Sequence, residues 1–195
     1  TISLHGIHRG GLKAGEYCAI IGAGPIGLLA GMIAQAYGAH AILLDLVQER
    51  LDFAKELGIE YVINSGEEDA AARVSEITGG MMAQQVMECS GSNAAIRSSL
   101  DLVSNAGRIT LTGWPPRETS IPTDIITRKE IDIRGARTSA GEFEEAIELI
   151  YTKKVDVAKI LTKTISLDEA PETIRDIEKN PGNYMKVVVK VDKTV

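Results

Sequence analysis

A glycine-rich turn between an apolar run and a helix-like segment constrains the fold of this chain more than any other feature. The apolar run Tyr17–Ile21 predicts a strand covered on both faces, as in a parallel sheet. The turn after it has the pattern G-x-G-x-x-G and consists of Gly22, Ala23, Gly24, Pro25, Ile26 and Gly27. A helix over 25–37 is predicted next, because proline is tolerated in a first helical turn. The hexapeptide alone is a weak signal, but a preceding strand and a following helix are the context that a dinucleotide-binding loop requires.

The three glycines of this turn have separable roles. Gly22 permits the tight turn, Gly24 lets the backbone approach a pyrophosphate, and Gly27 lets the helix pack closely on the strand. The start of the helix offers free N–H groups and about half a positive charge to an anion. The turn therefore predicts a diphosphate site, with a purely structural turn as the alternative.

An acidic residue at the end of the second predicted strand gives the next signal. Asp45 lies 18 residues after Gly27. A carboxylate there can accept both hydroxyls of an adenosine ribose and would repel a 2′-phosphate, which favours NAD over NADP. Arg50 follows in the next helix and could flank the adenine or pair with Asp45, which weakens the exclusion of NADP. A solvated acid at a strand end is the alternative for Asp45.

Strand-like and helix-like segments alternate from about residue 16 to residue 135. Six strands are expected over 17–21, 41–44, 61–63, 85–88, 108–111 and 131–134. One of the intervening helices is expected to open with a capping box formed by Ser65 and Glu68. This order predicts a doubly wound α/β domain, with a parallel six-stranded Rossmann sheet in the strand order 3-2-1-4-5-6.

The carboxyl ends of the fourth and fifth strands are expected to line the rest of the binding crevice. Both ends carry small residues, which suit a cofactor lying across them, although ordinary turns would look the same. These residues are Cys89, Ser90 and Gly91, and Leu111, Thr112 and Gly113.

The pattern changes after Gly135. A helix near residue 147, a strand over 160–165, a helix capped by Asp168 and a strand over 186–191 are expected. The two late strands have no predicted neighbours, and unpaired backbone groups are costly. We therefore predict a dinucleotide-binding domain over 1–137, and a segment over 138–195 that completes a catalytic domain absent from this chain.

The charge and apolar content exclude some partners. The formal net charge is −6, and no basic run exceeds two residues, so nucleic acid is not an expected partner. No stretch of about 18 apolar residues exists, so no membrane span is expected.

Cysteine and histidine give no metal or catalytic constellation. Cys18 and Cys89 form no disulfide framework or C-x-x-C pair, and are interpreted as reduced, buried thiols of a cytoplasmic protein. His5 and His8 share a helical face but lack a third ligand. With His40, they are interpreted as surface residues. We predict a cofactor site without catalytic or metal-binding residues.

Two segments around the glycine turn, residues 11–16 and 21–28, resemble the medium-chain dehydrogenase/reductase family. Within it, the chain is most similar to the zinc-type polyol dehydrogenases of the sorbitol or iditol kind. The tetrapeptide from Glu88 to Gly91 and the later Asn180-Pro181-Gly182 fit this resemblance. It covers essentially the whole chain and is specific in the first 115 residues.

The resemblance implies an NAD-dependent alcohol dehydrogenase that transfers hydride from a secondary alcohol or sugar alcohol to NAD. In such enzymes zinc is held mostly by an N-terminal catalytic segment, which this sequence lacks. The chain alone is therefore expected to bind NAD without turnover.

The resemblance also implies roles for individual residues. Ile26 would touch the pyrophosphate or the nicotinamide ribose, and Asp45 with Arg50 would bind the adenosine ribose. Ala136 and Arg137 would lie near the nicotinamide end, beside residues 111–113. The strand from Ile131 to Arg134 would pair across a two-fold axis, which implies a homodimer or a homotetramer.

Three other functions fit parts of the sequence. A zinc-free quinone or enoyl reductase of the same family would prefer NADPH, against which Asp45 argues. A non-catalytic dinucleotide-binding module would explain the missing catalytic residues. A methyltransferase would bind S-adenosylmethionine at a similar first turn, but the third glycine and the late elements favour a dehydrogenase.

Overall fold

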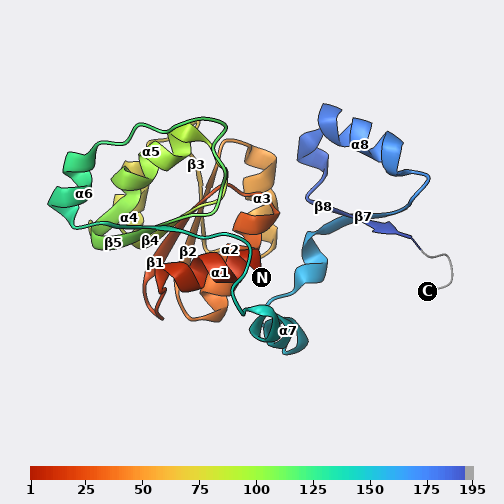
Figure 1. Cartoon of the computed structure of the whole chain (residues 1–195), viewed down its shortest axis with the longest axis horizontal. Coiled ribbons are helices and arrows are strands. Elements are labelled where there is room, and N and C mark those ends of the chain that lie inside the picture. The colour runs from red at the N-terminus through yellow and green to blue at the C-terminus, as the bar shows by residue number, and fades with distance from the viewer. Residues whose placement is uncertain (192–195) are drawn as a thin grey trace. The chain divides into compact units, whose positions relative to one another are not determined.

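The computed structural model describes residues 1–191 and divides into two compact units, Thr1–Val155 and a smaller one that starts at Asp156 (Figure 1). The larger unit contains one parallel sheet in the order β3-β2-β1-β4-β5-β6, as predicted. The strands are β1 (Tyr17–Ile21), β2 (His40–Asp45), β3 (Tyr61–Asn64), β4 (Ala83–Glu88), β5 (Val103–Leu111) and β6 (Asp132–Gly135).

Helices cover both faces of this sheet, because each crossover between parallel strands must return over one face. The helices α1, α2 and α3 lie on one face, and α4, α5 and α6 lie on the other (Figure 1). Their bounds are α1 (Ile2–Gly10), α2 (Pro25–Ala36), α3 (Gln48–Glu56), α4 (Ala70–Ile77), α5 (Asn93–Leu102) and α6 (Thr123–Lys129).

The continuous apolar strands are buried on both sides, as their sequences predict. Ile20 and Ala41 point toward α2, where Gly31 lets the helix lie close to the sheet. On the opposite face, Ala19 and Ile42 belong to the main hydrophobic cluster. The absence of a polar face on the central strands is the reason that helices cover both sides.

The register of the sheet brings the strand ends to one edge. Leu44 of β2 pairs with Ile21 of β1, Ile21 with Glu88 of β4, Glu88 with Leu111 of β5, and Leu111 with Gly135 of β6. The residues that follow these positions therefore share the carboxyl edge of the sheet. They are Asp45, Gly22, Cys89, Thr112 and Ala136.

Two local predictions in this unit were wrong. The helix expected to open at the Ser65 and Glu68 capping box starts instead at Ala70. Its cap is Asp69, whose carboxylate accepts hydrogen bonds from the N–H groups of Ala71 and Ala72 at 2.9 and 3.1 Å. The fifth strand begins at Val103 rather than at residue 108.

Helix α7 (Phe143–Tyr151) follows β6 and belongs to the larger unit. Leu149 is buried, but four apolar side chains along the helix are exposed. These are Phe143, Ile147, Ile150 and Tyr151. They recur at i, i+4, i+7 and i+8, so α7 presents an apolar face that the described residues leave uncovered.

The smaller unit contains β7 (Leu161–Ser166), α8 (Ala170–Lys179) and β8 (Lys186–Lys190), with 3₁₀ turns at Val157–Ile160 and Pro181–Asn183. The expectation that its two strands lack neighbours was wrong, because α8 returns the chain so that β7 and β8 pair in parallel. Asp168 does not cap α8; the N-cap position is Glu169.

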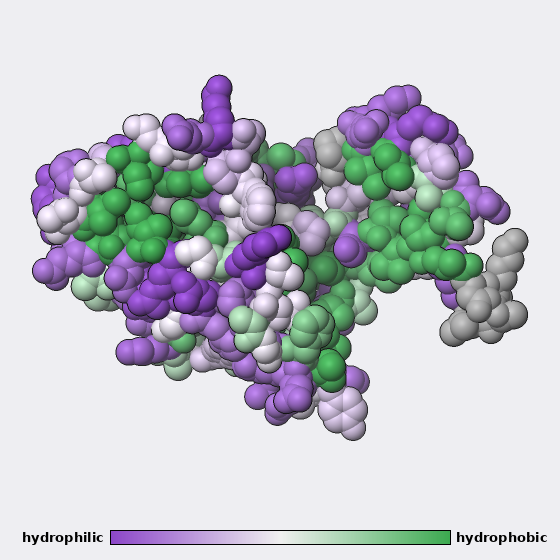
Figure 2. Space-filling model, viewed as in Figure 1, coloured by the Kyte–Doolittle hydropathy of each residue, from purple (hydrophilic) through white to green (hydrophobic). Residues whose placement is uncertain are grey.

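The two-stranded sheet of this smaller unit remains poorly covered. Leu161, Ile174, Val188 and Val189 are exposed. Figure 2 shows the resulting apolar surface around β7 and β8. A two-stranded sheet is marginal by itself, so this unit is expected to need further contacts.

Candidate dinucleotide-binding site

The three glycines of the loop differ in what surrounds them. Gly22 has a φ of +107°, a conformation that favours glycine. A Cβ on Gly27 would lie 1.8 Å from the carbonyl oxygen of Gly22, so only glycine fits where α2 crosses the loop. Gly24 has no atom within 4 Å of the position of a Cβ. It faces open space, which a diphosphate could occupy without meeting a side chain.

The first turn of α2 offers donors beside this space. Gly24 is its N-cap residue and provides no side-chain cap. Pro25 has no N–H, so the first free donors are the N–H groups of Ile26 and Gly27. The carbonyl of Ile26 accepts a hydrogen bond of 2.8 Å from the Ser3 hydroxyl, which fixes this turn against α1. The loop thus has the geometry of an anion site at a helix N-terminus.

Asp45 lies directly beside the glycine loop. Its Oδ2 atom accepts a 2.6 Å hydrogen bond from the N–H of Ala23, and its Oδ1 atom accepts bonds from the N–H groups of Leu46 and Val47. A carboxylate can accept about four hydrogen bonds. One further donor, such as a ribose hydroxyl, can therefore bind Oδ2 without displacing a backbone group.

Arg50 faces the same carboxylate from α3. Its Nη1 atom lies 3.9 Å from Oδ2 of Asp45, and its buried Nε atom has no hydrogen-bond partner in the structure. The side chain is 30% exposed, so the pair is weakly screened. Arg50 therefore lies where either a ribose or a 2′-phosphate would approach Asp45.

The sequence did not predict a role for Glu88, whose side chain holds the turn that follows β4 at the carboxyl edge of the sheet. This glutamate is completely buried. Its Oε1 atom accepts hydrogen bonds from the N–H and hydroxyl of Ser90 and from the N–H of Gly91, at 2.8, 2.5 and 3.0 Å. An acid directly after the apolar pair Val86 and Met87 was the available signal. Glu88 therefore sets the conformation of the turn through Cys89, Ser90 and Gly91.

The ends of β4, β5 and β6 pack tightly together. The N–H groups of Thr112 and Gly113 both donate to the carbonyl of Glu88. A Cβ on Gly113 would lie 2.2 Å from the N atom of Gly91, and the N–H of Ala136 donates to the carbonyl of Leu111 at 2.9 Å. The predicted residues of these three strand ends are thus brought together.

Arg137 comes directly after these packed strand ends and is exposed. Its guanidinium carbon lies 5.4 Å from the centroid of the Trp114 ring. The two side chains form a cation–π contact at the carboxyl edge.

The described residues contain no group of three histidine, cysteine or acidic side chains that could hold a metal ion. Burial raises the pKa of the Cys18 thiol to about 12 and also raises that of Cys89. Both thiols are therefore protonated near neutral pH when no metal is bound. The zinc that the resemblance implies therefore has no set of ligands among residues 1–191.

The prediction that His5 is a surface residue was wrong. His5 is buried, and its Nδ1 atom lies 2.6 Å from Oε1 of Glu142, just before α7. His8 approaches the same carboxylate, with its Nδ1 atom 3.7 Å from Oε1 of Glu142, and its Nε2 atom lies 3.3 Å from Glu145. Desolvation opposes ionisation of Glu142, but hydrogen bonds from His5, Ala140 and Ser139 lower its pKa to about 2.

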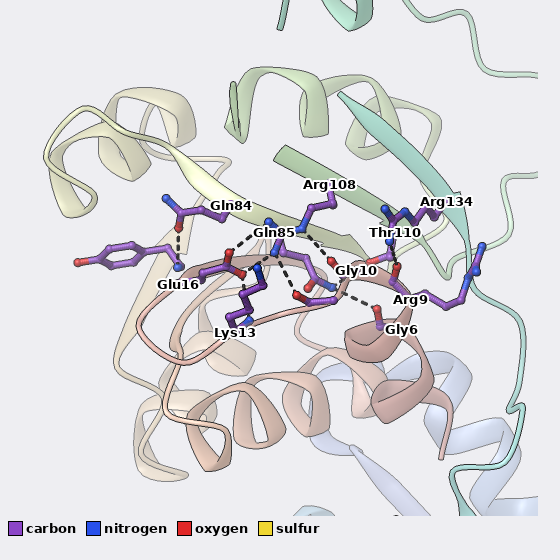
Figure 3. Close-up of polar contacts among 12 residues, drawn as sticks. Gly6, Arg9, Gly10, Lys13, Glu16, Gln84, Gln85, Arg108, Thr110 and Arg134 are labelled. Atoms are coloured by element: carbon purple, nitrogen blue, oxygen red, sulfur yellow. Dashed lines mark hydrogen bonds and ion pairs between the residues drawn. The ribbon is translucent and has the colours of Figure 1, made fainter. Parts of the chain in front are cut away.

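A second unpredicted network holds the other end of α1 (Figure 3). Arg108 of β5 donates from Nε to the carbonyl of Gly10, and Arg134 of β6 donates from Nη1 to the carbonyl of Arg9. Gln85 of β4 donates to the carbonyl of Gly6 at 3.2 Å. Guanidinium groups at a helix C-terminus satisfy its free carbonyls. Helix α1 is therefore fixed at both ends beside the glycine loop.

Three features occur together here: a doubly wound sheet, a glycine loop whose Gly24 faces open space, and a carboxylate at the adjacent strand end. This combination defines the class of dinucleotide-binding domains. Within that class, residues 25–152 match the family described as zinc-binding dehydrogenase. The chain belongs to this family.

Relatives with known names are alcohol and polyol dehydrogenases. An uncharacterized zinc-type alcohol dehydrogenase-like protein of Haemophilus influenzae is 51% identical over 187 residues, which cover 96% of this chain and 55% of that protein. The sorbitol dehydrogenase of Gallus gallus is 30% identical and is matched over 100% of this chain and 55% of its own length. The chain thus spans about half the length of the curated relatives it matches.

Solved structures share the fold. An Escherichia coli oxidoreductase/dehydrogenase of unknown specificity has a TM-score of 0.93 and 27% identity, covering 98% of this chain and 55% of that one. A Sinorhizobium meliloti protein described as a zinc-binding dehydrogenase and bound to NADP has a TM-score of 0.88 and 27% identity, covering 97% and 56%. None of the helices described between residues 1 and 191 has the length and apolar character that a membrane crossing needs.

Proposed function

We propose that this chain is the NAD-binding portion of a zinc-type dehydrogenase that oxidises secondary alcohols or sugar alcohols. One observation carries the proposal: the open space at Gly24 lies beside a carboxylate that is hydrogen-bonded to the same loop. A diphosphate at the loop and a ribose at Asp45 would use both features together.

The residues of this chain bind and orient the cofactor. The N–H groups of Ile26 and Gly27 donate hydrogen bonds to the diphosphate, and Asp45 accepts a hydrogen bond from a ribose hydroxyl. Thr112 and Gly113, at the end of β5, line the path of the remaining half. NAD supplies the hydride acceptor. No step of the chemistry is assigned to this chain, because its residues do not fit zinc, and we expect it to bind NAD without turnover.

Calorimetric titration with NAD and NADP tests the cofactor assignment. We expect NAD to bind more tightly, because the charge of Asp45 opposes a 2′-phosphate. The comparison is informative because the Sinorhizobium meliloti neighbour holds NADP. No NAD binding at millimolar concentration, or tighter binding of NADP, would refute the assignment.

The same titration separates the alternatives. Tighter NADPH binding would favour a zinc-free quinone or enoyl reductase. Binding of S-adenosylmethionine in place of NAD would favour a methyltransferase. The titration does not distinguish a dehydrogenase from a non-catalytic dinucleotide-binding module. An activity assay of the complete protein makes that distinction.

We further propose that residues 138–195 complete the catalytic domain, whose other part corresponds to the portion of the relatives that this chain does not cover. The exposed apolar face of α7 supports this assignment. Ile147→Glu should leave the melting temperature of the chain unchanged and weaken its association with the N-terminal portion of the Haemophilus influenzae relative. Glu144→Gln, on the same helix, is the matched control. Equal association of both variants would refute this role of α7.

A homodimer through β6 is a separate proposal. The strand lies at the sheet edge, Ile133 is 36% exposed, and a small apolar pocket beside it is lined by Leu111 and Ile121. Edge strands readily pair with a second copy. Sedimentation should show a dimer that Ile133→Lys dissociates, and a monomeric parent chain would refute it.

A cytoplasmic location, suggested by the two unpaired cysteines, also remains a prediction.

A further inference from the structure

Arg137 is an exposed cation whose charge is not matched by a carboxylate. Among residues 1–191, its one recorded partner is the ring of Trp114, at 5.4 Å. Trp114 is itself 73% exposed and is the single tryptophan of the chain. An exposed guanidinium without a carboxylate beside it is free to bind an anion, and the adjacent indole ring adds an apolar contact surface.

The backbone beneath this pair is firmly held. The N–H of Ala136 is bound to β5, and the backbone of Trp114 lies within 2.7 to 3.1 Å of the position of a Cβ on Gly91. Thr138, next to Arg137, has a φ of +59°. A β-branched residue rarely adopts this conformation, and such strain concentrates at functional sites.

Trp114 and Arg137 follow β5 and β6, at a defined distance from Asp45 along the carboxyl edge of the sheet. β2, which carries Asp45, is separated from β5 by three strand spacings, or about 14 Å. If the adenosine ribose binds at Asp45, a dinucleotide that crosses the edge brings its reactive half toward β5 and β6. In that arrangement Trp114 and Arg137 would lie beside the reactive half of the cofactor, where the substrate must approach.

We propose that Arg137 binds an anionic group of the substrate, so that the substrate is a polyol carrying a carboxylate or a phosphate. This inference rests on the proposed function. The planar guanidinium matches the two oxygens of either group, and the Trp114 ring offers an apolar face to the carbon chain of a sugar. The local positive charge of Arg137 favours an anion at this point, even though the chain as a whole is negatively charged.

Because Trp114 is the only tryptophan, emission excited at a wavelength that tyrosine does not absorb reports on the surroundings of this ring. The chain is saturated with NAD and titrated with sorbitol, with gluconate, which carries a carboxylate, and with sorbitol 6-phosphate. Sodium chloride keeps the ionic strength constant. We expect one of the two anions to change the emission at a concentration at least tenfold lower than sorbitol, and the two anionic arms identify which group is bound.

Arg137→Gln should abolish the difference between the anion and sorbitol, and Arg137→Lys should retain part of it. If NAD binds but the anions act no better than sorbitol, the inference is wrong and the proposed function stands. An anion preference that survives in Arg137→Gln would also overturn it. If NAD does not bind at all, both proposals fail.

Discussion

The Oδ2 atom of Asp45 accepts a 2.6 Å hydrogen bond from the N–H of Ala23, which lies between the first two glycines of the loop. The carboxylate therefore orients the loop, and in the proposed NAD complex it would also accept a ribose hydroxyl. Asp45→Asn keeps an oxygen acceptor but removes the charge. Its amide NH₂ must face either the N–H of Ala23 or those of Leu46 and Val47, so we expect a loosened loop, weaker NAD binding and a loss of discrimination against NADP. The ratio of the two dissociation constants measures this, and an unchanged ratio would remove Asp45 from cofactor selection.

Two glycines of the loop should respond differently to the same substitution. Gly24 has a φ of −76° and open space at the Cβ position, so Gly24→Val should preserve the fold and abolish NAD binding. Gly27→Val should destabilise the protein, because its Cβ would overlap the carbonyl of Gly22. Thermal melts and calorimetry on both variants test this contrast. Full NAD affinity in Gly24→Val would show that the diphosphate binds elsewhere.

Replacement of the buried Glu88 should distort the turn that follows β4 at the carboxyl edge of the sheet. In Glu88→Gln, an amide NH₂ can face the buried N–H groups of Ser90 and Gly91, and an unsatisfied buried donor costs about 1–3 kcal/mol. We expect a lower melting temperature and a larger loss of affinity for NAD than for ADP, because ADP does not reach the β4 and β5 ends. The exposed Glu67→Gln variant is the control. Equal losses for NAD and ADP would contradict this local role.

Acid should weaken the attachment between α1 and the segment before α7. The pKa of Glu142 is lowered from 4.5 to about 2, so its folded form favours the carboxylate. Its contribution to stability is present above pH 4.5 and is lost as the pH falls toward 2. Glu142→Gln should therefore be less stable than the parent at pH 6, and the difference should shrink at pH 3. Denaturant melts at both values test this, and a constant difference would contradict it.

Much of the fold and part of the candidate site were predictable from local patterns. The apolar strand, the turn and the helix around Gly22 lie next to one another in the chain, and Asp45 ends a strand that the same periodicity marks. The strand order and the common carboxyl edge follow from the handedness of parallel crossovers. Leu111, Thr112 and Gly113 reach the edge for the same reason.

The remaining features depend on contacts between residues far apart in sequence. Glu142 meets His5 across 137 positions, and Arg108 caps α1 across 98. No local pattern distinguishes such a buried histidine or arginine from a solvated one, because the partner is known only after the chain has folded. The sequence by itself determined the loop, the sheet and the acid at its edge. Tertiary packing alone decided which polar groups are buried together, since the cost of leaving them unpaired is met by distant partners.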